Sequence, residues 1–177
     1  MEYWDVYDAD RRLTGRRIRR GEKLEKGEYH LSVHVLIRRG DGKLLLQRRA
    51  ADKADWPGVW DISAAGSALA GEGSREAAAR ELREELGIEL FFSEAAPRLM
   101  LSLKDCFGDW YLMETEMALP IVLQREEVAD AGWFTREELE EMLADGRMVD
   151  YNPGLFSLLL DNEPGMGAMR SWRGRWK

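Results

Sequence analysis

The sequence is poor in cysteine: its 177 residues include a single one, Cys106. One cysteine excludes an intrachain disulfide framework, and the absence of any Cys-x-x-Cys pair excludes the usual cysteine-rich zinc sites. The sequence also lacks an apolar run of about 18 residues, so it predicts no transmembrane helix. Its N-terminus, MEYWDVYDAD, is too acidic and polar for a signal peptide. We therefore expect a soluble protein of the reducing cytoplasm.

An excess of positive charge is missing too. The 26 lysines and arginines are outnumbered by 33 aspartates and glutamates, which gives a formal net charge of −7. So acidic a chain argues against general binding to nucleic acid, and a polyanionic ligand would need a metal ion and a local basic patch. The segment from Arg11 to Lys26 is such a patch, with eight basic residues against two acidic ones. We interpret it first as the charged edge of a hairpin, with contact to phosphate as the alternative.

The length suits one domain, and no repeat or low-complexity linker divides it. We expect a hairpin extension over residues 1–29, a main body over residues 30–162 and a tail over residues 163–177. In the extension, Tyr3 to Tyr7 and Leu13 to Ile18 alternate like two short strands joined by a polar turn. The hairpin and the tryptophan-bearing tail are candidate contacts of a homodimer.

The main body mixes strands and helices. Strands are expected at residues 31–37, 44–49, 90–92, 99–103 and 110–117. Ser74 is expected to cap a helix over residues 75–86, which Gly87 ends. Thr135 opens a capping box, and Asn152 starts a last helix that should cover the far face of the sheet.

The most informative stretch runs from Gly66 to Ile88 and reads GSALAGEGSREAAARELREELGI. On the expected helix, Glu81, Glu84 and Glu85 share one face, because residues three and four apart are neighbours there. Their carboxylates repel one another, and Arg80 can neutralise only one of them. A hard divalent cation such as Mg²⁺ is the natural partner of several converging carboxylate oxygens. A solvated acidic helix laced by arginines is the alternative.

This stretch follows the pattern G-x5-E-x7-R-E-U-x-E-E-x-G-U, where U is a bulky aliphatic residue, and so resembles the Nudix box at every position. The resemblance implies the Nudix fold, an α/β/α sandwich of the α+β class with a mixed sheet between helices. The roles that it implies are metal ligands at Gly66 (through its carbonyl), Glu81, Glu84 and Glu85, with Glu81 alternatively the general base, a further acidic contact at Glu72 and an orienting residue at Arg80.

The segment before the box, RRAADKADWPGVWDIS, resembles isopentenyl-diphosphate isomerase, a Nudix-fold enzyme, and the hydrolases similar to it. The comparison implies that Arg49 and Lys53 hold a substrate diphosphate, which a forked guanidinium and a nearby ammonium suit. The isomerase also needs a reactive cysteine and a metal-binding histidine around the first glycine of the box, where this sequence has Ala65 and Ser67. Since alanine cannot transfer a proton at carbon, an isomerase-like hydrolase is favoured over an isomerase.

A later segment, Gln124 to Val128 followed by Trp133, resembles the E-V-x4-W segment of many Nudix hydrolases. In that segment an acidic loop residue can complete the metal site. Glu127 is the candidate for this role and Glu126 its alternative, against the simpler interpretation of both as ordinary surface acids.

Other side chains have simpler interpretations. His30 and His34 lie four apart on an expected strand and would share a face. That arrangement would suit a metal site, but no cysteine or third histidine supports one, so we interpret both as ordinary hydrogen-bonded or exposed residues. The tryptophans Trp56, Trp60 and Trp110 could stack on a base but are more typical of a core.

The sequence thus predicts a metal-dependent hydrolase that cleaves the diphosphate (pyrophosphate) bond of a nucleoside diphosphate linked to a moiety X. Mg²⁺ is the expected cofactor, with Mn²⁺ as a substitute. Water would attack one phosphorus in line while Glu81 or Glu127 takes its proton. The alternatives are an isopentenyl-diphosphate isomerase-like enzyme and a catalytically silent nucleotide-binding Nudix module.

Overall fold

The structure, a computed structural model, describes residues 1–116 and 119–161. The predicted tail and the end of the strand predicted at 110–117 lie outside the described residues. The elements follow one another as β1 (Tyr3–Tyr7), β2 (Leu13–Arg19), β3 (His30–Arg39), β4 (Leu44–Arg49), β5 (Trp60–Asp61), β6 (Ala64–Ser67), α1 (Ser74–Leu86), β7 (Leu99–Ser102), β8 (Cys106–Thr115), β9 (Val128–Phe134), α2 (Arg136–Ala144) and α3 (Pro153–Leu160). Among the described helices, none has the length and apolarity needed to cross a membrane.

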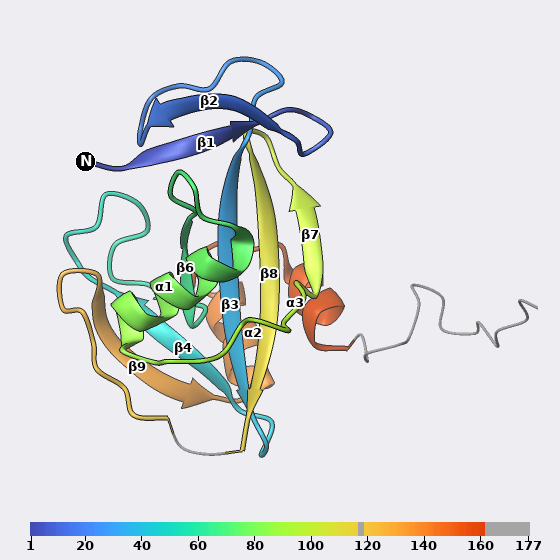
Figure 1. The fold of residues 1–177 in the computed structure, drawn as a ribbon. Helices are drawn as coiled ribbons and strands as arrows, with labels where there is room; N and C mark the ends of the chain where they lie inside the picture. Colours follow the sequence, from blue (N-terminus) through green and yellow to red (C-terminus); the bar gives the residue numbers. More distant parts are fainter. Residues whose placement is uncertain (117–118, 162–177) are drawn as a thin grey trace, which may run out of the picture.

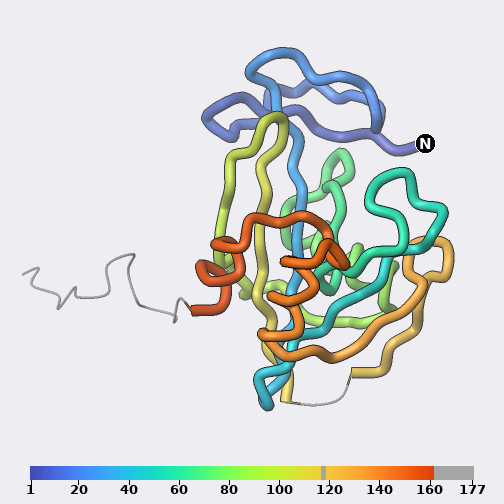
Figure 2. The backbone as a smooth tube through the Cα atoms, turned by 180° about the vertical axis from the view of Figure 1, so that it is seen from behind, coloured from blue at the N-terminus to red at the C-terminus, as the bar shows by residue number. Residues whose placement is uncertain are grey.

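A mixed sheet forms the centre of the molecule. Its strands follow the order β5-β4-β3-β8-β7, with β6 paired to β3 and β9 paired to β4. The long strands β3 and β8 run parallel, from His30 beside Cys106 to Arg39 beside Thr115, whereas the other pairs are antiparallel. Helix α1 lies on one face in Figure 1, and α2 and α3 lie on the opposite face, which Figure 2 shows from behind. The predicted α/β/α sandwich of the α+β class is confirmed.

Side-chain alternation along the strands creates a core on each face of the sheet. On the α1 side, Val33 and Leu45 pack with Leu82 of the helix, and on the other side Leu46 packs with Phe156 of α3. All of these side chains are fully buried or nearly so. The leucine run of β4 is therefore buried on both faces because neighbouring residues of a strand point in opposite directions.

Two local predictions were wrong. The stretch 90–92 forms no strand; Phe92 is instead buried edge-on against Tyr111 beneath α1. Ser74 is the first residue of α1 and not its cap, since Gly73 takes that position without a side-chain hydrogen bond. The Ser74 hydroxyl lies 2.8 Å from the Tyr111 hydroxyl, so a tertiary contact takes the group that would otherwise cap the helix.

The predicted N-terminal hairpin is present and forms its own small sheet of β1 and β2 (Figure 1). It docks on the loop that precedes α1: Ala70 donates its N–H to the Tyr3 carbonyl at 2.8 Å, and Gly71 donates to the Asp5 carboxylate at 2.6 Å. At its turn, Arg11 pairs at 2.5 Å with the buried Asp109 of β8. The hairpin thereby covers one end of the sheet, next to the loop between β6 and α1.

Candidate active site

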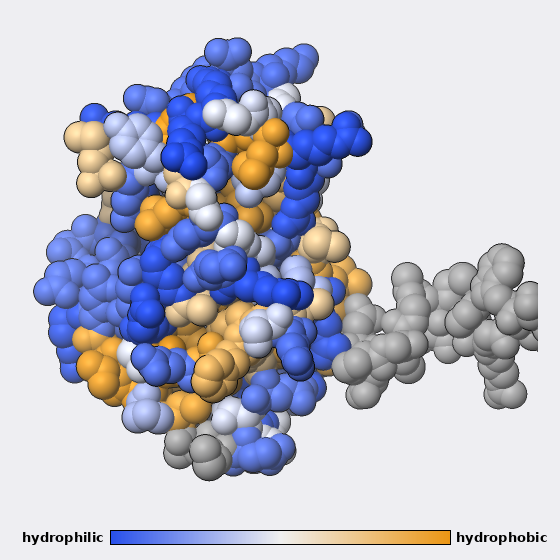
Figure 3. Space-filling view, in the orientation of Figure 1, coloured by the Kyte–Doolittle hydropathy of each residue, from blue (hydrophilic) through white to orange (hydrophobic). Residues whose placement is uncertain are grey.

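A polar cavity of about 190 Å³ lies beside α1, at the end of the molecule that the hairpin covers. Hydrophilic side chains cover much of the hairpin and α1 on this face (Figure 3). The cavity brings together most of the predicted site residues with two from the hairpin, and its lining includes Glu2, Arg20, Arg49, Lys53, Gly66, Arg80, Glu81, Glu84, Glu85, Gln124 and Glu127.

Strand β6 lies close to the first carboxylate of the site. Gly66 pairs with Val33 of β3, and α1 packs directly over this strand. A Cβ atom at Gly66 would lie 2.0 Å from Oε1 of Glu81, so only glycine allows the carboxylate to approach the β6 backbone this closely. Burial raises the pKa of Glu81, and Arg80 partly offsets this rise.

Arg80 organises the acidic residues around it. Its guanidinium donates to both oxygens of Glu72 at 2.8 and 2.9 Å, to Glu81 at 2.9 Å and to Glu84 at 3.0 Å. It also donates to the Ser67 carbonyl at 3.0 Å, which ties α1 to β6. Glu72 is absent from the cavity lining, so its two hydrogen bonds bind the Arg80 guanidinium from outside the cavity. Arg80 therefore contacts three glutamates at once, and Glu72 binds its guanidinium through two hydrogen bonds.

Glu85 is the most buried carboxylate of the cavity, with 7% of its surface exposed. Its Oε2 accepts a hydrogen bond from Gln47 Nε2 at 2.7 Å and another from the Ala65 N–H at 3.3 Å. Burial, followed by the neighbouring charges of Glu81 and Asp61, raises the pKa of Glu85 to about 8. The protein alone therefore leaves this negative charge undercompensated, which is the electrostatic setting of a cation site.

The predicted substrate-binding cations lie across the cavity from α1. Lys53 forms an ion pair with Glu127, the predicted loop acid. Arg49 donates to the Asp55 carbonyl at 3.0 and 3.2 Å and to Oδ2 of the buried Asp61 at 3.3 Å. Hydrogen bonds and an ion pair with neighbouring acceptors thus position both cations at the cavity.

Two residues at or behind the cavity, Arg20 and Asp61, were not predicted from the sequence. Arg20 reaches the cavity from the end of β2 and pairs with Glu2 at 2.6 Å. The basic patch was the only sequence signal for Arg20, and the phosphate-facing interpretation of that patch was the less favoured one. Asp61, which also accepts from the Tyr151 hydroxyl at 2.7 Å, had no distinguishing signal at all.

Other candidates lie elsewhere. Glu126, the alternative loop acid, is exposed and is absent from the cavity lining. Trp110 is buried in a stack on His34 with ring centroids 4.0 Å apart, and Trp60 packs edge-on against Phe134. Trp60 and Trp110 therefore pack in the core as predicted, whereas the core interpretation was wrong for Trp56, whose side chain is 48% exposed.

Comparison with known proteins gives consistent matches. The NUDIX domain profile matches residues 28–153. The chain is 45% identical over 152 residues to the uncharacterized Nudix hydrolase lmo0368 of Listeria monocytogenes, covering 85% of this chain and 90% of that one. It is 36% identical to the uncharacterized Nudix hydrolase PA4841 of Pseudomonas aeruginosa, covering 84% and 85%. The crystal structure of DR0079 from Deinococcus radiodurans superposes with a TM-score of 0.69 at 25% identity, covering 82% and 90%.

Proposed function

The chain belongs to the Nudix hydrolase family, and from this premise we propose that it is a metal-dependent pyrophosphohydrolase acting on a nucleoside diphosphate linked to a moiety X. The observation that carries the proposal is the cavity itself, where three box glutamates face Arg20, Arg49 and Lys53. One side suits divalent cations and the other suits phosphate oxygens, so a diphosphate fits between them.

The donor set fits a hard divalent cation. The carboxylates of Glu81, Glu84 and Glu85 and the Gly66 carbonyl would hold it, since all four residues line one cavity and offer oxygen. The raised pKa of Glu85 supports this fit, because its negative charge has too little compensation from the protein. Bound Mg²⁺ or Mn²⁺ would supply Lewis-acid polarisation of the phosphate and a lowered pKa of water.

The chain's own residues then carry out positioning and proton transfer. Arg49 and Lys53 bind the diphosphate oxygens and offset the charge that develops on the departing phosphate. With Glu81 among the metal ligands, Glu127 of the same cavity accepts the proton of the attacking water. The water oxygen forms a bond to one phosphorus, the bond from that phosphorus to the bridging oxygen breaks, and the other phosphate leaves with the electron pair.

The isomerase alternative finds no suitable groups at the cavity. Its described lining contains no thiol, and Cys106 lies at the start of β8, outside the lining. At the two positions in question, the Ala65 N–H donates to Glu85 and the Ser67 carbonyl accepts from Arg80, which are structural roles.

The test is turnover of a substrate panel in Mg²⁺ and in Mn²⁺, with Glu84→Gln beside the wild type. The panel holds nucleoside triphosphates, nucleotide sugars, ADP-ribose, dinucleoside polyphosphates and isopentenyl diphosphate, with products resolved by chromatography. Glu84→Gln should lower kcat by about a hundredfold or more, since a metal ligand supplies several kcal/mol of transition-state stabilisation. Glu76→Gln, an exposed glutamate of the same helix, should leave it unchanged.

Two outcomes contradict the proposal. Wild-type turnover in Glu84→Gln would place the metal elsewhere. Tight nucleotide binding without turnover of any panel member would favour the silent module.

A further inference from the structure

Outside the catalytic cavity, three side chains with different metal-binding chemistry meet where β3 and β8 begin. His30 opens β3 and pairs with Cys106 in the parallel ladder, and its N–H donates to the Asp105 carbonyl at 3.1 Å. One ligand atom from each of His30, Asp105 and Cys106 lies within 4.8 Å of the others. Sequence alone could not show this group, because His30 lies 75 residues before Asp105 along the chain and only the strand pairing unites them.

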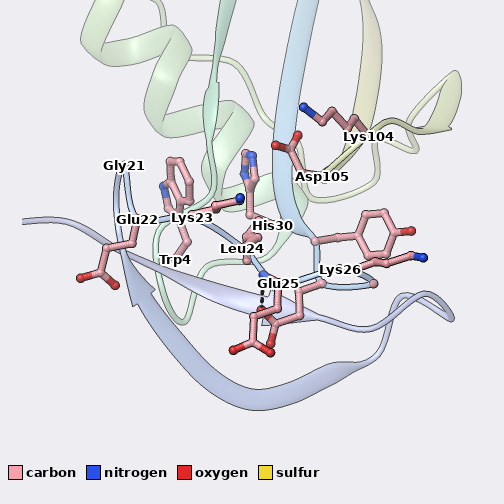
Figure 4. A pocket seen from close by; sticks show the side chains of 13 residues that line it. Trp4, Gly21, Glu22, Lys23, Leu24, Glu25, Lys26, His30, Lys104 and Asp105 are labelled. Carbon is pink, nitrogen blue, oxygen red and sulfur yellow. Dashed lines mark hydrogen bonds between the residues drawn. The ribbon is translucent and has the colours of Figure 1, made fainter.

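Two of the three residues border a large open pocket. A cavity of about 1100 Å³ lies between the loop that follows β2 and the turn before β8, and both His30 and Asp105 line it. In Figure 4 the imidazole and the carboxylate point toward one another, with the Trp4 ring against the imidazole. Trp4 and His30 stack with ring centroids 4.2 Å apart and an interplanar angle of 14°. The stack fixes the orientation of the imidazole, and the pocket gives an ion access to it.

The polar atoms of this group are incompletely used by the protein. The Nδ1 atom of His30 is buried and has no hydrogen-bond partner among the described residues. A buried polar atom without a partner is uncommon in a folded protein and points to an absent ligand. Among the described residues, the Cys106 sulfur accepts a long contact from the Ser32 hydroxyl at 3.7 Å; burial raises the pKa of this thiol, and the Ser32 donor partly offsets that rise.

We propose that His30, Asp105 and Cys106 bind a transition-metal ion of the Zn²⁺ class at a site separate from the catalytic cavity. The argument is the donor set: nitrogen, carboxylate oxygen and sulfur suit Zn²⁺ or Co²⁺, whereas Mg²⁺ prefers oxygen alone. Three protein ligands leave the fourth tetrahedral position to water or a ligand from the pocket. Binding releases the thiol proton of Cys106 to solvent and joins the ends of two central strands.

Cobalt spectroscopy tests this site separately from the catalytic one. Because Cys106 is the single cysteine of the chain, a thiolate-to-cobalt charge-transfer band reports this site alone. Titration of the wild type with Co²⁺ should produce that band together with the visible absorption of a four-coordinate ion. One equivalent of Zn²⁺ should abolish both signals, and excess Mg²⁺ should leave them in place.

Variants assign the ligands. Cys106→Ser should remove the charge-transfer band, and His30→Gln should weaken Co²⁺ binding enough to lose the signal at one equivalent. Lys104→Ala, which changes a neighbour of Asp105 in the same pocket (Figure 4), should keep the band. Glu84→Gln should also keep it, so failure of the catalytic proposal and failure of this one are distinguishable.

A second measurement needs no variant. Zn²⁺ should slow the alkylation of Cys106 in the wild-type protein if the thiolate is a ligand. A wild type that shows neither a charge-transfer band with Co²⁺ nor protection from alkylation by Zn²⁺ overturns the proposal. So does a four-coordinate cobalt spectrum that survives in a folded Cys106→Ser variant.

Discussion

At the scale of single residues, the geometry of the site depends on a few close contacts of Glu81 and Glu85, and single neighbouring residues allow or make each of them. Gly66 matters for the atom it lacks, because its missing Cβ leaves room for Glu81. Gln47 and Ala65 hold Glu85 by hydrogen bonds in a place where water could not compensate its charge. Substitutions at this scale should therefore affect geometry and charge before they affect the fold.

Gly66→Ala should lower kcat by about tenfold or more with little change in unfolding temperature. The new methyl group would overlap the Glu81 carboxylate and displace it, and a displacement of about 1 Å at a catalytic group is costly. Steady-state kinetics and thermal melting measure the two effects. Gly40→Ala is the matched control, because its Cβ would meet Glu116 Oε2 at 2.4 Å outside the cavity lining. Equal kinetic losses in both variants would contradict the assignment.

Asp61→Asn should raise KM by about tenfold and change kcat less. Asp61 holds the Arg49 guanidinium at 3.3 Å, and a charge-assisted hydrogen bond to a buried group contributes about 1.5 kcal/mol or more. Loss of the carboxylate charge should loosen the cation that we propose binds the diphosphate. Asp55→Asn serves as the control, since Asp55 holds Arg49 through its backbone carbonyl. A change confined to kcat would argue for a catalytic role of Asp61 instead.

At the scale of elements, the hairpin of β1 and β2 is the addition that completes the cavity. The loop before α1 donates two hydrogen bonds to β1, one to the Tyr3 carbonyl and one to the Asp5 carboxylate, and β1 pairs with β2, from whose end Arg20 reaches the cavity. Besides covering the end of the sheet, the hairpin segment therefore contributes Glu2 and Arg20 to the lining of the candidate site.

Arg20→Ala should raise KM by up to about fivefold, the effect of removing one partly exposed cation worth about 1 kcal/mol. The loss should shrink at high ionic strength, because salt screens exposed charges. Arg19→Ala, an exposed neighbour on β2, should leave KM unchanged. Equal effects of the two variants would show that only the overall charge of the hairpin matters.

At the scale of the whole molecule, burying the charged Glu85 carboxylate lowers the stability of the fold. Burial of apolar side chains on both faces of the sheet offsets this loss. Glu85 is buried with a pKa of about 8, above the 4.5 of an ordinary glutamate, so the folded chain binds this proton more tightly than the unfolded one. Its contribution to stability is present below pH 4.5 and is lost as the pH rises through about 8.

In chelator, the free energy of unfolding should therefore fall between pH 5 and pH 8 by up to about 1.4 kcal/mol per pH unit. Glu85→Gln should flatten this dependence, because a neutral amide can still accept the Gln47 hydrogen bond. Mg²⁺ should restore stability at pH 8 in the wild type alone. Urea unfolding at the two pH values measures all three effects, and an equal slope in the variant would contradict the role of Glu85.

Much of this protein was readable from its sequence because the decisive patterns are local. The period of α1 placed Glu81, Glu84 and Glu85 together, and the capping box at Thr135 and the cap at Asn152 correctly began α2 and α3. These features depend on residues a few positions apart, whose geometry the backbone fixes.

Only the tertiary structure decided which distant residues meet. It brought Arg20 to the glutamates, Tyr151 to Asp61 and His30 to Cys106. It also removed the predicted strand at 90–92 and turned Ser74 from a cap into a partner of Tyr111. The physical reason is common to all of these cases: strand pairing and packing across the sheet join residues whose separation along the chain carries no periodic signal.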